Sequence, residues 1–236
     1  HQGEVVAWPT NLGWMMGPWL IYASLINRAT IALYYGAPTG ADFLRFVRDA
    51  QVNMLGVVPS LVRSWRTINA LHGIELSALR AFSSTGECSN AEDMHWLMAQ
   101  AGYKPVIEYC GGTELAGGYL TGSMIQPARP ASFTTPCLGI DMVLFDETEM
   151  PCDSGEAFLT SPSVGMSTTL IAGDHRSVYY EGTPRWNGQI TRRHGDRVER
   201  LGVAHYRVQG RADDAMNLGG IKVSSAEIER VLNTVE

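Results

Sequence analysis

The sequence predicts an α/β fold with a mainly parallel sheet and flanking helices, followed by a smaller, mostly β subdomain. In the first 123 residues, short apolar runs alternate with segments of helical spacing, which requires crossover connections between parallel strands. After about residue 123, prolines and glycines become frequent and helical periodicity disappears. We therefore expect three parts: an α/β subdomain over 1–123, a mostly β subdomain over 124–209, and a hinge with the first part of a small α+β domain over 210–236.

The elements of the first part follow from periodicity. Continuous apolar runs predict strands at 31–35, 54–58, 79–83 and 106–109. Amphipathic spacing predicts helices at 42–50 and 60–71, and Ser89-Asn90-Ala91-Glu92 has capping-box spacing for a third helix, which Gly102 closes.

An apolar run over 14–26 raises the question of a membrane segment. It is shorter than the roughly 20 residues that span a bilayer, and it contains Gly17 and Pro18. Because proline is tolerated in the first turn of a helix, we expect a buried helix that starts near Pro18.

The second part is expected to contain short antiparallel strands at 141–145 and 156–160, and then an irregular stretch to about residue 189. Ser224-Ser225-Ala226-Glu227 opens a further helix with Ile228, Val231 and Leu232 on one face. That helix has little partner of its own, so we expect the chain to stop just inside a third domain.

Composition narrows the class of protein. A hydrophobic content of 45% is ordinary for a globular chain of 236 residues, and a net charge of −6 does not favour nucleic-acid binding. Four cysteines without a C-x-x-C pair argue against structural zinc and fit free thiols in a reducing compartment. No signal peptide is apparent, and we expect a cytoplasmic location, with the peroxisome as the alternative.

Two strand ends carry glycine-containing turns, at 84–88 and 109–114. Ligands of parallel α/β sheets bind beyond the carboxyl ends of strands, and glycine lets a backbone approach a base or phosphate closely. The second turn also places a hydroxyl beside a carboxylate, at Thr113 and Glu114. Either turn alone is better explained by sheet-to-helix geometry, since neither is a dinucleotide fingerprint or a Walker loop.

Taken in order, these turns, Gly195-Asp196 and the run Gly210-Arg211-Ala212-Asp213-Asp214 resemble the adenylate-forming (AMP-binding) enzymes. The strings at 8–14, 110–115, 192–196 and 208–230 are most similar to acetyl-CoA-synthetase-like acyl-CoA synthetases, particularly plant peroxisomal acyl-activating enzymes. The resemblance implies ATP or AMP, Mg²⁺ and CoA as ligands and a small-molecule carboxylate as the substrate.

The resemblance also implies roles for individual residues. Thr113 lies near phosphate and Glu114 holds Mg²⁺, for which hard oxygen ligands are suited. Asp196 and Arg211 take the ribose, and Asp213 is the hinge of the C-terminal domain. The full set implied around the nucleotide is Gly86, Glu87, Cys88, Glu108, Tyr109, Cys110, Asp196, Arg211 and Lys222.

The acyl pocket implied by the resemblance is lined by Trp14, Val57, Val58, Gly111 and Gly112. Gly111 stands where acetate-specific members of the branch have a tryptophan that closes the pocket. A medium-chain or aryl-type acid is therefore expected, unless Gly111 serves only the backbone turn and Trp14 or Met15 fills the space.

Three departures from the family pattern bear on activity. The phosphate loop expected before this segment is absent from the sequence, as is the C-terminal domain with the adenylation lysine beyond its first helix, and Cys110 replaces an aromatic residue beside the adenine. We therefore expect the 236 residues to be inactive alone. A non-catalytic nucleotide- or acyl-binding module on the same fold is the alternative function.

Six arginines gather between positions 192 and 211. They are either a solvated face paired with Asp196, Glu199 and Asp213, or an electropositive rim for the phosphates of ATP and CoA. Both explanations stay open, except that the motif favours a nucleotide role for Arg211.

Overall fold

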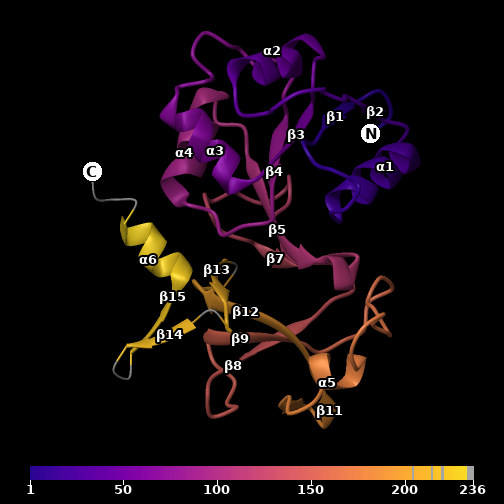
Figure 1. Cartoon of the computed structure of the whole chain (residues 1–236), viewed down its shortest axis with the longest axis vertical. Coiled ribbons are helices and arrows are strands. Elements are labelled where there is room, and N and C mark those ends of the chain that lie inside the picture. Colours follow the sequence, from indigo (N-terminus) through magenta and orange to yellow (C-terminus); the bar gives the residue numbers. More distant parts are fainter. Residues whose placement is uncertain (204, 214, 219–220, 233–236) are drawn as a thin grey trace. The chain divides into compact units, whose positions relative to one another are not determined.

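The structure, a computed structural model, describes residues 1–203, 205–213, 215–218 and 221–232. It divides into two compact units (Figure 1). Unit 1 comprises His1–Thr113 and Gly122–Ala131, and unit 2 comprises Glu114–Thr121 and Ser132–Glu236.

Unit 1 contains the parallel strands that the sequence predicts. Five strands pair in the order β2-β1-β3-β4-β5, and every pairing among them is parallel. Their bounds are β1 Val5–Ala7, β2 Thr30–Ile31, β3 Met54–Val57, β4 Ala81–Ser84 and β5 Val106–Gly112. β1 was not predicted because three residues are too few to show a period, and β2 is shorter than the expected strand at 31–35.

The helices of unit 1 cover both faces of these strands. They are α1 Met16–Asn27, α2 Ala41–Asp49, α3 Pro59–Thr67 and α4 Ala91–Gln100. Figure 1 shows α3 and α4 on one side of β3, β4 and β5, and α1 on the other side. The predicted alternation of strand and helix is therefore confirmed.

The period of two along each strand explains the two layers of core. Leu55 and Val57 of β3 belong to the core shared with α2, α3 and α4, whereas Met54 packs with Trp8 and α1. A Cβ on Gly56 would lie 1.9 Å from the indole ring of Trp8, so only glycine allows this ring to rest on β3.

The prediction that α1 is buried was wrong for half of the helix. Met16 and Leu20 are buried, but Leu25 and Ile26 are 67% and 79% exposed. Helix α1 is apolar around most of its circumference. The sequence therefore does not indicate which face of the helix is exposed.

The N-terminus of α4 is capped one residue later than the sequence spacing suggests. The Asn90 side chain accepts hydrogen bonds from the backbone N–H groups of Glu92 and Asp93. Ser89 is not the cap, since its hydroxyl donates to Glu108 instead.

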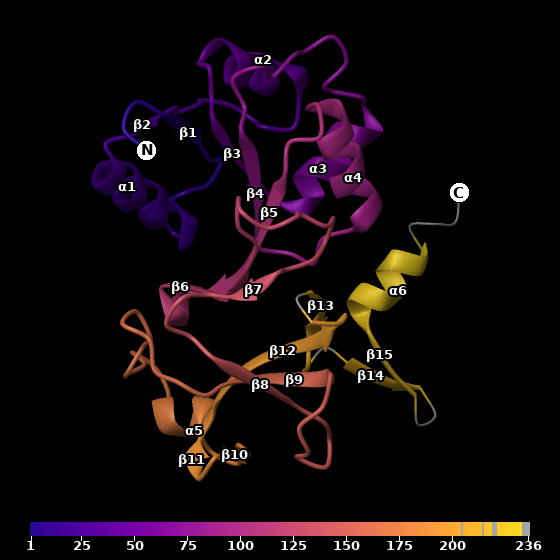
Figure 2. The same cartoon turned by 180° about the vertical axis from the view of Figure 1, so that it is seen from behind.

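Unit 2 is built around the antiparallel sheet β13-β12-β9-β8 (Figure 2). Its strands are β8 Met142–Phe145, β9 Ser154–Leu159, β12 Arg192–Arg200 and β13 Tyr206–Arg211. Strands β6 Gly117–Thr121 and β7 Thr135–Pro136 of this unit pair antiparallel. The mostly β character of this part is confirmed.

The stretch expected to be irregular up to residue 189 contains a short helix and the start of a small hairpin. Helix α5 His175–Tyr179 is capped by the side chain of Asp174, and β10 Arg185–Trp186 pairs with β11 Gln189–Ile190. The helix has only five residues, too few to show a helical period in the sequence.

At its C-terminal end the chain forms the hairpin β14 Ala215–Leu218 and β15 Ile221–Ser224, followed by α6 Ser225–Leu232. The helix that the sequence predicts after Ser224 is confirmed. Within the residues that the structure describes, no helix is long and apolar enough to cross a membrane. The domain boundaries expected at 123 and 209 stay predictions.

Candidate functional site

Glu114 lies in a short turn of unit 2. Strand β5 continues through Gly112, so the turn starts at Thr113, later than the sequence suggests, with the 3₁₀ helix η1 Thr113–Leu115. Ala116 follows with a left-handed backbone, at φ +47°. The Ser167 N–H donates to the Glu114 carbonyl oxygen at 2.7 Å, which ties this turn to a segment fifty residues away.

Asp196 lies on a bulge of β12. Arg193 pairs with Phe158 of β9 and Arg197 pairs with Glu156, so the three residues His194, Gly195 and Asp196 of β12 lie opposite a single residue of β9. Bulges of this kind redirect side chains and are common beside functional sites. Gly195 has φ +88°, and a Cβ on it would lie 2.5 Å from the Arg211 guanidinium, so glycine is required for this approach.

The bulge gathers donors around the Asp196 carboxylate. The Tyr119 hydroxyl donates to Asp196 Oδ2 at 2.9 Å, and His194 Nε2 lies 3.1 Å from the same oxygen. Arg211 Nη1 lies 3.3 Å from Oδ1 and donates to the His194 carbonyl oxygen at 2.8 Å. The Asp196 side chain is 10% exposed and is held by groups from three strands. Such a fixed carboxylate is suited to accepting hydrogen bonds from a diol.

His194 also faces the carboxylate of Glu114. Its Nδ1 atom lies 3.5 Å from Glu114 Oε1, and the imidazole and the Tyr119 ring are 4.3 Å apart between centroids. The Glu114 side chain is 28% exposed and forms no ion pair with a lysine or arginine in the described residues. Its carboxylate offers oxygens of the kind that bind a hard cation such as Mg²⁺, but no group of three or more His, Cys, Asp or Glu side chains in the described residues is placed to hold a metal ion.

Arg211 is partly buried between two carboxylates. Burial lowers the pKa of its guanidinium, but the charges of Asp196 and Asp213 outweigh this effect and raise it above the ordinary value. Arg211 is therefore a permanent cation at the end of β13. The predicted hinge residue Asp213 accepts from Arg211 Nε at 3.3 Å, and its side chain is 74% exposed.

In unit 1, the carboxylate of Glu87 is bound within the fold. It accepts hydrogen bonds from the backbone N–H and the hydroxyl of Ser60 at 2.8 and 2.9 Å, and so caps the N-terminus of α3. Gly86 precedes it with φ +95°. The carboxylate of Glu87 is therefore engaged within unit 1, and the expected contact between the backbone of this turn and the adenine stays a prediction.

Glu108 is buried in β5 and accepts a hydrogen bond from Ser89 Oγ at 2.9 Å. Burial raises the pKa of this carboxyl to about 7, although the hydrogen bonds from Ser89 and Ser84 oppose the shift. Desolvation has the larger effect because the charged form has lost its water.

The residues predicted to line an acyl pocket lie in unit 1 in different environments. Val57 is buried, Val58 is half-buried, and Trp14 is 69% exposed. Gly111 and Gly112 are the last residues of β5 and form no turn.

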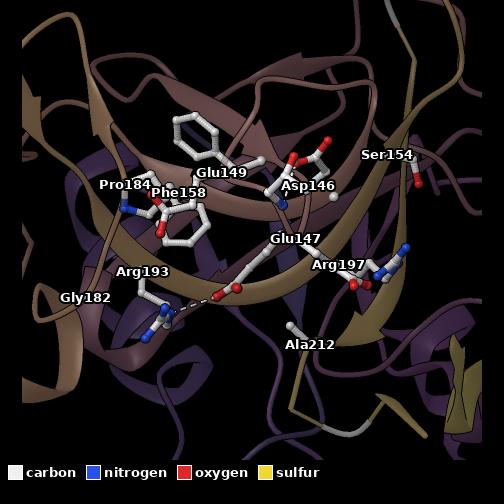
Figure 3. Close-up of a pocket in the computed structure, with 14 residues that line it drawn as sticks. Asp146, Glu147, Glu149, Ser154, Phe158, Gly182, Pro184, Arg193, Arg197 and Ala212 are labelled. Carbon is white, nitrogen blue, oxygen red and sulfur yellow. Dashed lines mark hydrogen bonds and ion pairs between the residues drawn. The ribbon is translucent and has the colours of Figure 1, made fainter. Parts of the chain in front are cut away.

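A cavity of about 460 Å³ lies elsewhere, on the antiparallel sheet of unit 2 (Figure 3). Its lining combines Asp146, Glu147 and Glu149 with Arg193 and Arg197, and Arg193 forms a 3.0 Å ion pair with Glu156. None of the predicted nucleotide or acyl residues lines it.

Within unit 2, the structure brings three predicted residues together: Glu114, Asp196 and Arg211. Lys222 pairs with Asn217 in the β14–β15 hairpin, and its side chain lies outside the described residues. Sequence reasoning missed Tyr119 and His194. In the arginine cluster, Arg207 pairs with Glu199 and Arg200 with Asp153, which supports a solvated face for these two, whereas Arg192 is buried.

Comparison with known proteins identifies relatives along the whole chain. Residues 1–167 match the family model described as "AMP-binding enzyme". The chain is 53% identical over 241 residues to "Probable acyl-activating enzyme 17, peroxisomal" of Arabidopsis thaliana and 51% identical over the same length to "Hexanoyl-CoA synthase" of Cannabis sativa. All of this chain is covered, but only 33% and 34% of those proteins, so the chain spans about a third of their length.

Among solved structures, the chain is similar to "Acetoacetyl-CoA Synthetase from Streptomyces lividans", with a TM-score of 0.85. The match covers 99% of this chain and 37% of that one, at 23% identity. The likeness shows that both chains share a fold.

Proposed function

Since this chain belongs to the AMP-binding enzyme family, we propose that it is the core segment of an AMP-forming acyl-CoA synthetase. The observation that carries this proposal is the convergence of Glu114, His194, Asp196 and Arg211 in unit 2. The imidazole of His194 lies between the carboxylates of Glu114 and Asp196. In a metal-bound nucleotide, the first would face the metal ion and the second the ribose diol.

The proposed reaction has two steps. A substrate carboxylate attacks the α-phosphorus of ATP, the bond to pyrophosphate breaks, and acyl-AMP forms. The thiol of CoA then attacks the acyl carbon and AMP leaves. Positioning and charge neutralisation supply most of the rate enhancement in such transfers.

Four residues of the chain have defined roles in this reaction. Asp196 and Arg211 bind the ribose, Thr113 contacts a phosphate, and Glu114 would hold Mg²⁺. Bound there, the ion would supply charge neutralisation at the phosphates.

For the base and the moving domain, the proposal follows the family pattern. The backbone of Gly86, Glu87 and Cys88 lies along the adenine, near Glu108, Tyr109 and Cys110. Asp213 is the hinge of the C-terminal domain. Lys222, which follows the hinge in the chain, contacts the nucleotide. CoA enters as the second substrate.

We propose a medium-chain or aryl-type acid as the substrate. The similarity to a hexanoyl-CoA synthase supports this, as does Gly111 in the position implied for a closing tryptophan. Each methylene that the vacated space buries favours binding by roughly 0.8 kcal/mol.

Comparison of kcat/KM for acetate, hexanoate and a phenyl-substituted acid in the complete protein tests the pocket. We expect hexanoate or the aryl acid to be preferred, and Gly111→Trp to shift the preference toward acetate. A wild-type preference for acetate over both larger acids would refute the open pocket.

Carboxylate-dependent ATP–pyrophosphate exchange tests the activity itself. The complete protein should catalyse exchange, whereas binding of AMP without any exchange would favour a non-catalytic module on the same fold. The peroxisomal location in the name of the Arabidopsis relative supports the peroxisome as the site of action.

A further inference from the structure

Arg192 is a buried cation that the proposed reaction does not use. It begins β12, is 2% exposed, and belongs to the largest fully buried side chains of the protein. Its Nε and Nη1 atoms have no hydrogen-bond partner in the described part of the chain. Burying a charge without a carboxylate partner is costly, and an apolar side chain of similar size is often as stable or more stable. Stability therefore does not explain an arginine here.

The guanidinium makes two contacts, and both reach the segment 163–180. Its Nη2 atom donates to Ser167 Oγ at 3.1 Å, and its Cζ atom lies 3.8 Å from the centroid of the Tyr179 ring. His175 joins the same group, because its Nε2 atom lies 2.8 Å from the Ser167 carbonyl oxygen. Arg192 therefore connects the beginning of β12 with both ends of this segment.

The same segment lies against the turn that carries Glu114. Ser167 donates its backbone N–H to the Glu114 carbonyl oxygen at 2.7 Å. A Cβ on Gly165 would lie 2.7 Å from the Leu115 carbonyl oxygen and 2.8 Å from Ala116 Cβ, so the two backbones touch.

The turn itself is short and conformationally unfavourable. A single 3₁₀ turn is followed by the left-handed Ala116, a conformation that side chains with a Cβ rarely adopt. Such a turn keeps its shape because neighbouring structure fixes it. In unit 2, the neighbour that does so is the pair Gly165 and Ser167.

We propose that Arg192 is a positioning residue for Glu114: it holds Ser167, and Ser167 holds the backbone from which the Glu114 carboxylate projects. This inference rests on the proposed function, in which Glu114 binds Mg²⁺. The contact between Arg192 and Ser167 can be tested independently of that function.

The experiment replaces Arg192 by methionine in the complete protein and measures two quantities. Hydrogen exchange of the Ser167 amide should accelerate at least roughly tenfold, because its bond to Glu114 opens more often. The Mg²⁺ concentration that half-saturates ATP binding should rise roughly tenfold, while AMP affinity without metal stays unchanged. The thermal midpoint should stay the same or rise, which separates positioning from a general loss of stability.

Arg193→Met is the matched control. The next residue along β12 is also an arginine, but its ion pair with Glu156 belongs to the cavity of Figure 3. Neither Ser167 exchange nor Mg²⁺ dependence should change in this variant. Arg192→Lys, which retains a donor for Ser167 but not the planar stack on Tyr179, should restore part of the protection.

Tyr179→Leu removes the stacking surface and leaves Arg192 in place, so it decides the question if Arg192→Met does not fold. It should accelerate Ser167 exchange in the same direction. Unchanged exchange in Tyr179→Leu and in a folded Arg192→Met would overturn the proposal.

Faster exchange with unchanged Mg²⁺ dependence would overturn its functional part if Glu114→Gln does shift that dependence. If Glu114→Gln also leaves Mg²⁺ dependence unchanged, the proposed metal role of Glu114 is wrong, and the functional part of the positioning proposal fails with it, whatever the exchange of Ser167 shows.

Discussion

The two units use the carboxylates of their motifs in different ways. In unit 1, Glu87 caps α3 through Ser60 and Glu108 is buried against Ser89. In unit 2, Glu114 stays partly exposed, and Asp196 is oriented by donors from separate strands. A carboxylate in a family motif therefore has one of two environments: it either binds to groups of its own fold or keeps oxygens available for a ligand.

This difference has a physical origin in the local chain path. The turn at 84–88 lies beside the N-terminus of α3, whose N–H groups need acceptors, and Glu87 supplies one. The bulge in β12 has the opposite effect, because it lifts His194, Gly195 and Asp196 out of the regular pairing with β9. Side chains on such a bulge point away from the ladder and can meet a ligand.

The largest effect should come from unit 2, through Glu114. We expect Glu114→Gln to lower the rate of adenylation by roughly a thousandfold, about 4 kcal/mol, because a neutral amide holds Mg²⁺ poorly. The measurement is ATP–pyrophosphate exchange as a function of Mg²⁺ in the complete protein. Glu147→Gln, on the exposed β8–β9 hairpin, is the control and should change nothing.

A Glu114→Gln variant with normal rate and normal Mg²⁺ dependence would contradict the metal role of Glu114. The distinction between the units would then depend on Asp196 alone.

The next largest effect should appear in the stability of unit 1, through Glu108. Its pKa is raised from 4.5 in the unfolded chain to about 7 in the fold. The protonated form is favoured by folding, so its stabilising contribution is full below about pH 4.5 and is lost as the pH rises through about 7. By the size of the shift, the loss is up to about 3 kcal/mol.

Glu108→Gln removes this titration. Denaturant unfolding at pH 5 and pH 8 should show that the variant gains stability relative to the wild type as the pH rises. Parallel pH profiles for the two proteins would show that Glu108 is not a buried titrating group.

The smallest effect should come from Glu87. Glu87→Gln weakens the cap of α3, and we expect a loss of about 1 kcal/mol in the free energy of unfolding with AMP affinity unchanged. Thermal unfolding and calorimetry measure the two quantities. A large loss of AMP affinity without a loss of stability would mean that the Glu87 side chain contacts the nucleotide, and the contrast between the units would then be wrong.

Sequence patterns predicted the elements whose periods are long enough to read, such as α2 and α3. They failed where a single side-chain contact determines where an element begins. Helix α4 is an example, because Asn90 and not Ser89 caps it. Tyr119 and His194 could not be found from spacing. The Tyr119 hydroxyl meets Asp196 77 residues further along, and only the pairing of strands creates that contact. The family motifs implied that Asp196 and Arg211 take the same ribose, although the bulge that brings the two side chains together was not visible in the sequence.

Binding of AMP in the absence of metal tests the central claim most directly, that unit 2 presents Asp196 to the ribose. Calorimetric titration should show Asp196→Ala weakening AMP binding by roughly ten- to a hundredfold, the effect expected when hydrogen bonds to a charged group are lost. Asp153→Ala, an exposed carboxylate of the same sheet region, should bind AMP as the wild type does. Unchanged AMP affinity in a folded Asp196→Ala variant would contradict the ribose assignment.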